Sequence, residues 1–350
     1  MSSDTPFDSC PAPYIEHERV LLGHGSGGTM TTQLVEGLFL PAFSNDMLAR
    51  LDDQAVIDPP AGRLAFTTDS YVVTPVFFPG GDIGSLAIHG TVNDLAMCGA
   101  RPLYISVAFI LEEGLLFADL RRIVRSMADA AREASVQIVT GDTKVVGKGS
   151  GDQIFINTSG IGVVPQNVDI SARRARPGDA VIVSGTLGDH GMAILAARQS
   201  LGLEGELRSD SASLHDLVAA LIAACPGVHA LRDPTRGGVA TTLFEIAARA
   251  SVGVEIDESA LPVRDDVRGA CEILGLDPLY VANEGKLVAF VAEDQADAAL
   301  TTLRAHPLGR DAARIGTATA THPGDVFLRT RIGAHRALLR PHGELLPRIC

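Results

Sequence analysis

The sequence has no tryptophan, only four tyrosines and only five cysteines. The cysteines are odd in number, widely spaced and never in a C-x-x-C pair, which argues against a disulfide framework and against a structural zinc site. Basic residues are also scarce, because 29 lysines and arginines stand against 42 aspartates and glutamates, for a formal net charge of −13. A chain this acidic, without a basic stripe, is not expected to bind nucleic acid.

Long hydrophobic runs are missing as well. The longest apolar stretch, about residues 217–225, is far shorter than the roughly 20 residues that span a bilayer. The first residues, MSSDTPFDSCPAP, hold acids and prolines where a secretory signal has a basic start and an apolar run. The sequence therefore predicts a cytoplasmic protein that does not enter the membrane.

The chain is long enough for two domains. It has 350 residues, of which 46% are hydrophobic, and one domain usually takes about 100–200 residues. Strand-like and helical patterns alternate on both sides of the basic, turn-forming segment 172–179, which predicts an α/β protein with a boundary near residue 170. The clearest helix is 119–134, whose apolar residues recur at period 3.6 and which Asp119 is placed to cap. The pattern is lost after Thr330.

Acidic residues of the first half stand beside predicted elements. Two follow the predicted strands 64–67 and 137–140, one precedes a short strand-like run, and one lies in a glycine-bounded helix. Mg²⁺ takes oxygen ligands and leaves phosphate oxygens to complete its shell, so these positions predict a metal–phosphate site. Any one of the aspartates is equally typical of a cap or turn. In chain order the residues are Asp53, Asp69, Asn93 with Asp94, and Asp142 with Lys144.

Two glycine-rich segments are candidates for binding anions. Gly25, Gly27 and Gly28 lie in a loop that can fold over a phosphate through its backbone N–H groups, although the spacing is neither a Walker nor a Rossmann fingerprint, and a plain hinge is an equal alternative. The segment 233–238 leads directly into a helix, where free N–H groups and Arg236 favour an anion. An ordinary N-terminal turn is the alternative there.

Three further features bear on chemistry. Glu284 lies between two predicted apolar strands, where a carboxylate is either a turn residue or a partly desolvated general base. The histidines at 89, 190 and 215 have no metal-ligand spacing and are interpreted as structural. Cys350 is the last residue, and a preceding segment of about 19 residues reaches up to ~60 Å when extended, so its thiol can enter a site as a substrate. An incidental thiol is the alternative.

Taken together, these segments resemble the HypE family of hydrogenase maturation proteins. The glycine and aspartate motifs recur in the wider aminoimidazole ribonucleotide synthetase-like (PurM-like) superfamily, whereas the ending Pro-Arg-Ile-Cys is specific. The resemblance runs from about His24 to the last residue. The motifs are HGSGG at 24–28, TDS at 68–70, HGTVNDLAMCGA at 89–100, GDTKVV at 141–146, DPTRGGV at 233–239, NEG at 283–285 and PRIC at 347–350.

The resemblance implies an α/β (α+β) fold of two PurM-like domains, in which a mixed N-terminal sheet forms a barrel in a homodimer and a flexible tail ends in a reactive cysteine. The expected segments are an extension with the glycine-rich loop at 1–45, an ATP-binding and dimerisation domain at 46–168, a second domain at 169–330 and the tail at 331–350.

The resemblance also implies a reaction. A carbamoyltransferase, HypF, places a carbamoyl group on Cys350, ATP with Mg²⁺ drives its dehydration from S-carboxamide to S-cyanate, and the cyanide passes to iron on a HypC–HypD scaffold. Glu284 is the expected base and Arg236 the orienting cation, while Lys144 meets the phosphoryl group. The expected Mg²⁺ ligands are Asp53, Asp69, Asp94 and Asp142, and the other ATP-binding residues are Gly25, Gly27, Gly28 and Asn93.

Three rival functions belong beside this one. A selenophosphate synthetase carries a cysteine or selenocysteine followed closely by lysine in the glycine-rich loop, and HGSGGTM has neither. A thiamine monophosphate kinase has no need of a terminal cysteine. A non-catalytic carrier that only presents Cys350 has no need of carboxylates near Lys144.

Overall fold

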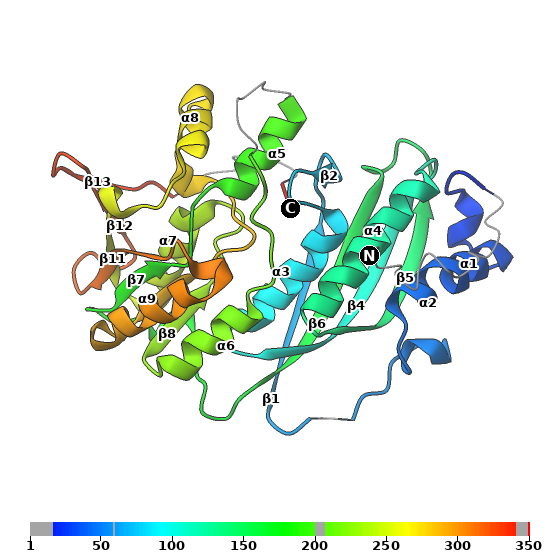
Figure 1. Ribbon diagram of the computed structural model, residues 1–350, viewed down its shortest axis with the longest axis horizontal. Coiled ribbons are helices and arrows are strands. Elements are labelled where there is room, and N and C mark those ends of the chain that lie inside the picture. The colour runs from blue at the N-terminus through cyan, green and yellow to red at the C-terminus, as the bar shows by residue number, and fades with distance from the viewer. Residues whose placement is uncertain (1–16, 59, 200–206, 341–348) are drawn as a thin grey trace, which may run out of the picture.

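The computed structural model describes residues 17–58, 60–199, 207–340 and 349–350. Each half of the chain builds its own sheet with helices against it, and Figure 1 shows the two units side by side, with the elements from β1 to β6 in one and those from β7 to β13 in the other. The expected two-domain α/β architecture with a mixed first sheet is confirmed.

The first sheet is built from four long strands in the order β1-β6-β4-β5. Only β4 and β5 run parallel. Helices α3 and α4 cover one face of this sheet (Figure 1). The bounds are β1 Arg63–Tyr71, α3 Ile83–Met97, β4 Arg101–Glu112, α4 Phe117–Glu133, β5 Gln137–Val146 and β6 Ile154–Val164, with a small hairpin of β2 Phe77–Phe78 and β3 Gly81–Asp82 before α3.

Helix α3 packs against both domains. Asp82 starts it, because its Oδ1 accepts the backbone N–H groups of Gly84 at 2.8 Å and Ser85 at 3.1 Å. The helix contacts β1 and β6 on one side and α6 (His215–Ala224) and β8 (Val228–Arg232) of the second domain on the other. An all-round buried helix needs apolar or small residues on every face, which explains its low polarity and its glycines.

The opposite face of the first sheet is open. Leu64 and Phe66 of β1 point outward and are 57% and 71% exposed. Their cross-strand partners on the same face are Val163 and Ile161 of β6. This is the face that the sequence predicts to close into a barrel with a second copy, and that dimer stays a prediction.

Strand ends and helix starts differ from the expectation in three places. β1 continues to Tyr71 and β5 to Val146, because their partner strands continue beside them, so Asp69 and Asp142 lie within strands rather than after them. The run 55–57 forms no strand. Helix α4 begins at Phe117, with Leu116 at the N-cap, so the expectation that Asp119 caps it is wrong. Burial of the Phe117 side chain draws the helix start towards the core.

The residues before the first strand pack on the first domain. They form η1 (Leu22–Gly25), α1 (Thr29–Leu34), η2 (Val35–Phe39), α2 (Leu40–Phe43) and η3 (Leu48–Arg50). Leu34, Leu38, Phe39 and Phe43 all belong to the core of that domain, so 17–45 is part of the domain rather than an extension from it. Residues 1–16, which include Cys10, lie outside the described part.

The second sheet has seven strands in the order β13-β12-β9-β11-β7-β10-β8. The four residues of β10 are buried, as expected for a central strand. The remaining bounds are β7 Ala180–Val183, α5 Asp189–Gln199, α7 Gly238–Ala250, β9 Gly253–Asp257, α8 Asp265–Leu274, β10 Val288–Val291, α9 Ala296–Ala305, β11 Ala313–Thr319, β12 Val326–Arg329 and β13 His335–Ala337.

The end of the chain differs from the expected tail at 331–350. β13 pairs with β12, and Leu338 is buried in the core of the second domain, because a free sheet edge and an apolar socket are available there. Residues 341–348 lie outside the described part. Ile349 is buried again, at 2% exposure.

Gly84 tests the packing of α3 against α4. A Cβ at this position would overlap the carbonyl oxygen of Ile123 and lie 2.8 Å from Cγ of Met127, so Gly84→Ala is expected to push the helices apart and to cost about 1–3 kcal/mol of unfolding free energy. The control is Gly269→Ala in α8, where a Cβ meets nothing, and which is expected to gain up to about 1 kcal/mol. Urea unfolding measures both, and equal effects would contradict the close packing.

Candidate active site

Residues from both domains and from the end of the chain meet where the two units contact each other. We call this region, defined by Asp69, Asp94, Asp233, Glu284 and Cys350, the cleft. β1 supplies Asp69, α3 supplies Asp94, and the loop before β10 supplies Glu284. Cys350 reaches the same place, and Figure 1 shows the C-terminus between the two units beside α3 and β2. The structure therefore brings together residues that are more than 200 positions apart in the sequence.

Glu284 is the buried centre of this cleft. It is 2% exposed, and its Oε1 has no hydrogen-bond partner among the described residues. Burial raises the pKa of its carboxyl well above the ordinary range, and the nearby charges of Asp233, Asp210 and Asp69 raise it further. The expectation of a desolvated carboxylate here is confirmed, although η6 (Pro278–Tyr280), rather than a strand, precedes the loop.

The thiol of Cys350 lies beside the carboxyl of Glu284, close enough for each group to shift the pKa of the other. Burial raises the pKa of the thiol well above its usual value, and the Glu284 charge adds to this. The end of the chain is therefore seated with a protonated thiol against the carboxyl group that the sequence predicts to be the base.

A run of carboxylates lines the cleft beside Glu284. Burial, together with the charge of Asp94, raises the pKa of Asp233 to about 7. Burial also raises the pKa of Asp94, with the charge of Asp69 adding to the effect, although Thr67 Oγ1 donates a hydrogen bond to Asp94 at 2.7 Å. Mutually repelling carboxylates of this kind form a site that is short of positive charge, which is the setting for a divalent cation.

The described residues hold no cluster of three or more His, Cys, Asp or Glu side chains in metal-binding geometry. The donor set nevertheless fits a hard cation, because all of its members are oxygens. Asp233 was not among the predicted ligands. It directly follows β8, the same kind of strand-adjacent position that pointed to the aspartates of the first half.

Asn93 and Arg236 take different positions around the cleft. The Asn93 amide donates to the backbone carbonyls of Ala212 and Glu284, both at 3.0 Å, and its Oδ1 accepts the N–H of Leu214 at 2.8 Å. Both amide hydrogens are therefore used within the chain. Arg236 is exposed before α7, close enough to lower the pKa values of Asp94 and Cys350 by its charge.

The other predicted residues gather elsewhere. Asp142 and Lys144 are exposed on β5 and pair at 3.5 Å. Their neighbours in register, Ala108 and Ile110, belong to the open face of the sheet, whereas Asp69 pairs with the buried Thr158 on the helix-covered face. Within one chain, the four predicted metal ligands are thus not brought together, and Asp53 is exposed in the segment between η3 and β1.

The glycine-rich loop joins the group on β5. The turn η1 contacts β5, and a Cβ on Gly25 would overlap the backbone nitrogen of Val145, so glycine is needed for this approach. Gly27 has a φ of +83°, which glycine adopts without strain, and Gly28 precedes α1.

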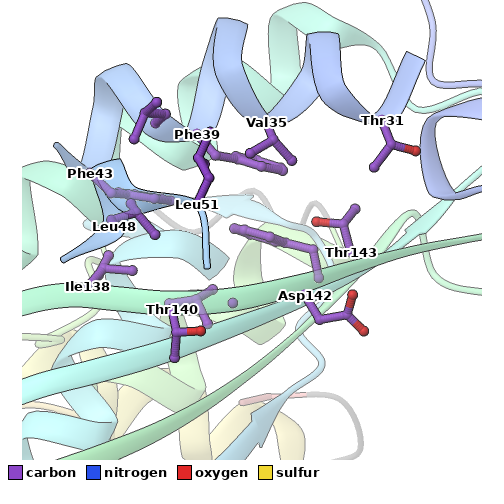
Figure 2. A pocket seen from close by; sticks show the side chains of 14 residues that line it. Thr31, Val35, Phe39, Phe43, Leu48, Leu51, Ile138, Thr140, Asp142 and Thr143 are labelled. Carbon is purple, nitrogen blue, oxygen red and sulfur yellow. The ribbon is translucent and has the colours of Figure 1, made fainter. Parts of the chain in front are cut away.

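A pocket of about 160 Å³ lies next to this loop, between α1, η2, α2 and β5. Figure 2 shows Phe39 and Phe43 at its apolar end and Thr31, Asp142 and Thr143 at its polar end. The polar end adjoins the glycine-rich loop, because Thr31 Oγ1 accepts the N–H of Gly27 at 2.9 Å. An apolar, aromatic-lined pocket with a few polar groups at one end is typical of a small-molecule site.

Sequence reasoning missed two residues behind Glu284. Asp210 Oδ1 accepts the backbone N–H of Glu284 at 3.0 Å, and its Oδ2 lies 3.0 Å from Nζ of Lys286. The Lys286 charge holds the pKa of Asp210 below its usual value despite burial. Asp210 lies in a serine-rich loop that carries no motif, so nothing in the sequence marks it.

Both domains match known protein families. Residues 51–164 match the N-terminal domain and residues 176–329 the C-terminal domain of the AIR synthase related proteins. The fold and the interdomain cleft define a two-domain protein of this class. Carbamoyl dehydratase HypE of Cupriavidus necator is 57% identical over 337 residues, 96% of each chain. The chain belongs to the HypE family of hydrogenase maturation proteins.

Solved structures agree. The crystal structure of hydrogenase maturation protein HypE in complex with ATP matches with a TM-score of 0.91 and 52% identity, covering 94% of this chain and 99% of that one. HypE in a HypE–HypF complex matches with a TM-score of 0.78 and 48% identity over 88% of this chain and 99% of that one. Thiamine monophosphate kinase from Aquifex aeolicus, at 22% identity and a TM-score of 0.59 over 77% of this chain and 89% of that one, shares the fold alone.

Asp233→Asn tests how much folding free energy is lost when Asp233 is ionised among the other carboxylates of the cleft. Because the pKa of Asp233 is about 7 in the folded protein and 3.8 in the unfolded chain, ionised Asp233 costs folding free energy that grows as pH rises from 3.8 to about 7 and is then constant. Without nucleotide, the variant is therefore expected to melt about 2–4 °C above the parent at pH 8 and to match it near pH 4. Thermal unfolding across this pH range measures the effect, and a stability gain that shrinks with rising pH would contradict it.

Proposed function

We propose that this chain is an ATP-dependent carbamoyl dehydratase that acts on its own Cys350. The observation that carries the proposal is the placement of the Cys350 thiol beside the buried Glu284 carboxyl. In the reaction an S-carboxamide on Cys350 loses water and becomes an S-cyanate. The name and the extent of the HypE relatives support the same activity.

The chemistry explains the need for ATP. Oxide is a very poor leaving group, so the amide oxygen first takes the γ-phosphoryl group of ATP and the nitrogen gives up one proton. Loss of phosphate with the second N–H proton then forms the nitrile. The sum is carboxamide and ATP giving cyanate, ADP, phosphate and a proton. Glu284 lies beside the reacting sulfur, and its raised pKa makes its carboxylate a stronger base than an ordinary glutamate. We therefore assign both nitrogen protons to it in turn: it releases the first to solvent, and then takes up the second and passes it to the departing phosphate.

Asp69, Asp94 and Asp233 are the residues that would hold Mg²⁺ in this cleft. Bound there, the ion neutralises phosphate charge. Arg236, together with the N–H groups at the start of α7, would orient the S-carboxamide or a phosphate. Asp53 and Asp142 were also predicted as ligands, and Asp142 lies in the group on β5 that a second copy can bring near.

A homodimer would bring the carboxylates of the cleft and the group on β5 into one site, with each group supplied by a different copy. A second copy that covers Leu64 and Phe66 closes the two open sheets into a barrel, and the free edges β1 and β5 of the two copies then meet. We propose the pairing in which β5 of one copy lies beside β1 of the other. It brings β5, with Lys144 at its far end, and the glycine-rich loop of one copy beside the end of β1 that carries Asp69 in the other, with the adenine in the pocket of Figure 2.

The partners follow from the reaction. A carbamoyltransferase of the HypF type would supply the carbamoyl group, in line with the HypE–HypF complex among the related structures. A HypC–HypD iron scaffold would receive the cyanide. We place the protein in the cytoplasm, where reducing conditions keep Cys350 a free thiol. In the described part of the chain, no helix is long and apolar enough to cross a membrane.

Glu284→Gln tests the base. After incubation with HypF, carbamoyl phosphate and Mg-ATP, the parent is expected to gain a carbamoyl group on its C-terminal peptide and then to lose one water. The variant should keep the carbamoyl group and lose water at least about a hundredfold more slowly, because it cannot accept the nitrogen protons. Intact-peptide mass spectrometry follows both steps. The control is Glu133→Gln on the exposed end of α4, and an active Glu284→Gln would overturn the assignment.

Hybrid dimers test the shared site. Asp69→Ala and Lys144→Ala are each expected to abolish dehydration. When the two inactive variants are unfolded together and refolded as a mixture, roughly half of the dimers are hybrids with one intact site each, so roughly a quarter of the parent activity returns. No recovery is expected if both residues act within one chain. Refolding each variant alone is the control and should restore nothing.

A further inference from the structure

His190 makes a contact that the proposed reaction does not use. It lies in α5 and is fully buried, with Nε2 2.9 Å from the backbone carbonyl oxygen of Ile349 and Nδ1 2.8 Å from Oγ of Ser209. The ring of Phe78 packs edge-on against it, with the centroids 5.7 Å apart. A buried histidine of the second domain thus bonds the residue next to Cys350.

The partners of the ring define its tautomer. A carbonyl oxygen only accepts hydrogen bonds, so Nε2 carries the proton and donates to Ile349. Burial lowers the pKa of His190 and keeps the ring neutral, so Nδ1 accepts from the hydroxyl of Ser209. Ser209 Oγ in turn accepts the N–H of Ser211 at 3.1 Å. Each group thus donates to the next, from the N–H of Ser211 through Ser209 and His190 to the carbonyl oxygen of Ile349.

The side chain of Ile349 supplies a second anchor. It is 2% exposed and belongs to the same core cluster as Ile194 of α5 and Ala282 beside the Glu284 loop, residues of the second domain that join the core of the first. Cys350 packs against this cluster. Backbone and side chain of one residue are therefore both bound, directly before the reactive cysteine.

We propose that His190 and the apolar socket of Ile349 form a recognition site for the end of the chain, which we call the end socket. His190 is a positioning residue: it holds the Ile349 carbonyl so that the sulfur of Cys350 faces Glu284. The inference rests on the proposed function for its purpose, but the end socket itself is a property of the unmodified chain. It also determines specificity, because a large apolar side chain followed by cysteine is the sequence that fits it.

Alkylation of Cys350 tests the end socket without any turnover. Iodoacetamide reacts with a thiolate, and the seated thiol is protonated and partly covered, so the folded parent is expected to react slowly. His190→Leu removes the donor and leaves a buried carbonyl unpaired, which should speed alkylation of Cys350 about tenfold. His190→Gln keeps a donor near the same place and should return most of the protection. Mass spectrometry of the C-terminal peptide gives the rate.

Two internal controls keep the test clean. Cys225 and Cys271 are 0% and 1% exposed, so their peptides should stay unmodified in every variant that is folded. Ile349→Ala should speed alkylation as His190→Leu does. Leu339→Ala, which trims a side chain that is 77% exposed in the same part of the chain, should change nothing.

The outcomes separate the end socket from the proposed function. Equal alkylation rates in the parent, His190→Leu and Ile349→Ala overturn the end socket, even if dehydration proceeds in the parent. Faster alkylation with rescue by His190→Gln supports it, even if the parent shows no dehydration, and in that case only the proposed function is lost. In the carbamoylated protein, His190→Leu should lower the maximal rate constant for water loss about tenfold. It should leave the ATP concentration that gives half of that rate unchanged, because it alters the position of Cys350 rather than nucleotide binding.

Discussion

The burial of Glu284 among other carboxylates is the constraint around which this structure is arranged. A carboxyl group in this position resists ionisation, and it is kept there by contacts from both domains. Asp210 holds its backbone N–H, Asn93 holds its backbone carbonyl, and Cys350 meets its side chain. Lys286 pairs with Asp210, with its Nζ 3.0 Å from Oδ2 of that carboxylate. The remaining negative charge is available for a cation and for the proton transfers of the proposed reaction.

Much of the fold could be predicted from the sequence, because each long element has a clear period. The apolar stripe of α4 and the buried runs of β7 and β10 are local properties. Strand lengths were underestimated, because β1 and β5 continue only through pairing with strands far away in the sequence. That error mattered for the site. Alternate residues of a strand face opposite sides of the sheet. Asp69 of β1 lies on the helix-covered face and Asp142 of β5 on the open face, so the sheet separates the two carboxylates.

The candidate site was predictable only in part. Glu284 and Cys350 carried signals in the sequence, and the structure sets them in contact. Asp233 lies in the segment 233–238, which the sequence predicts to be either an anion site or an ordinary N-terminal turn, and β8 before it carried no clear signal. His190 and Asp210 had no signal at all, because their roles come from contacts with residues 159 and 74 positions away. Such contacts depend on how two domains pack, and no local pattern contains that information.

Asn93 also has a consequence for motion. One side chain on a helix of the first domain bonds two backbone carbonyls and one N–H of the second domain, including the backbone of Glu284 itself. Rotation of one domain against the other would break all three bonds at once and leave buried polar groups unpaired. The two domains are therefore fixed relative to each other. For Cys350 to meet a carbamoyl donor outside the cleft and Glu284 inside it, the end of the chain has to move while the two domains keep their positions.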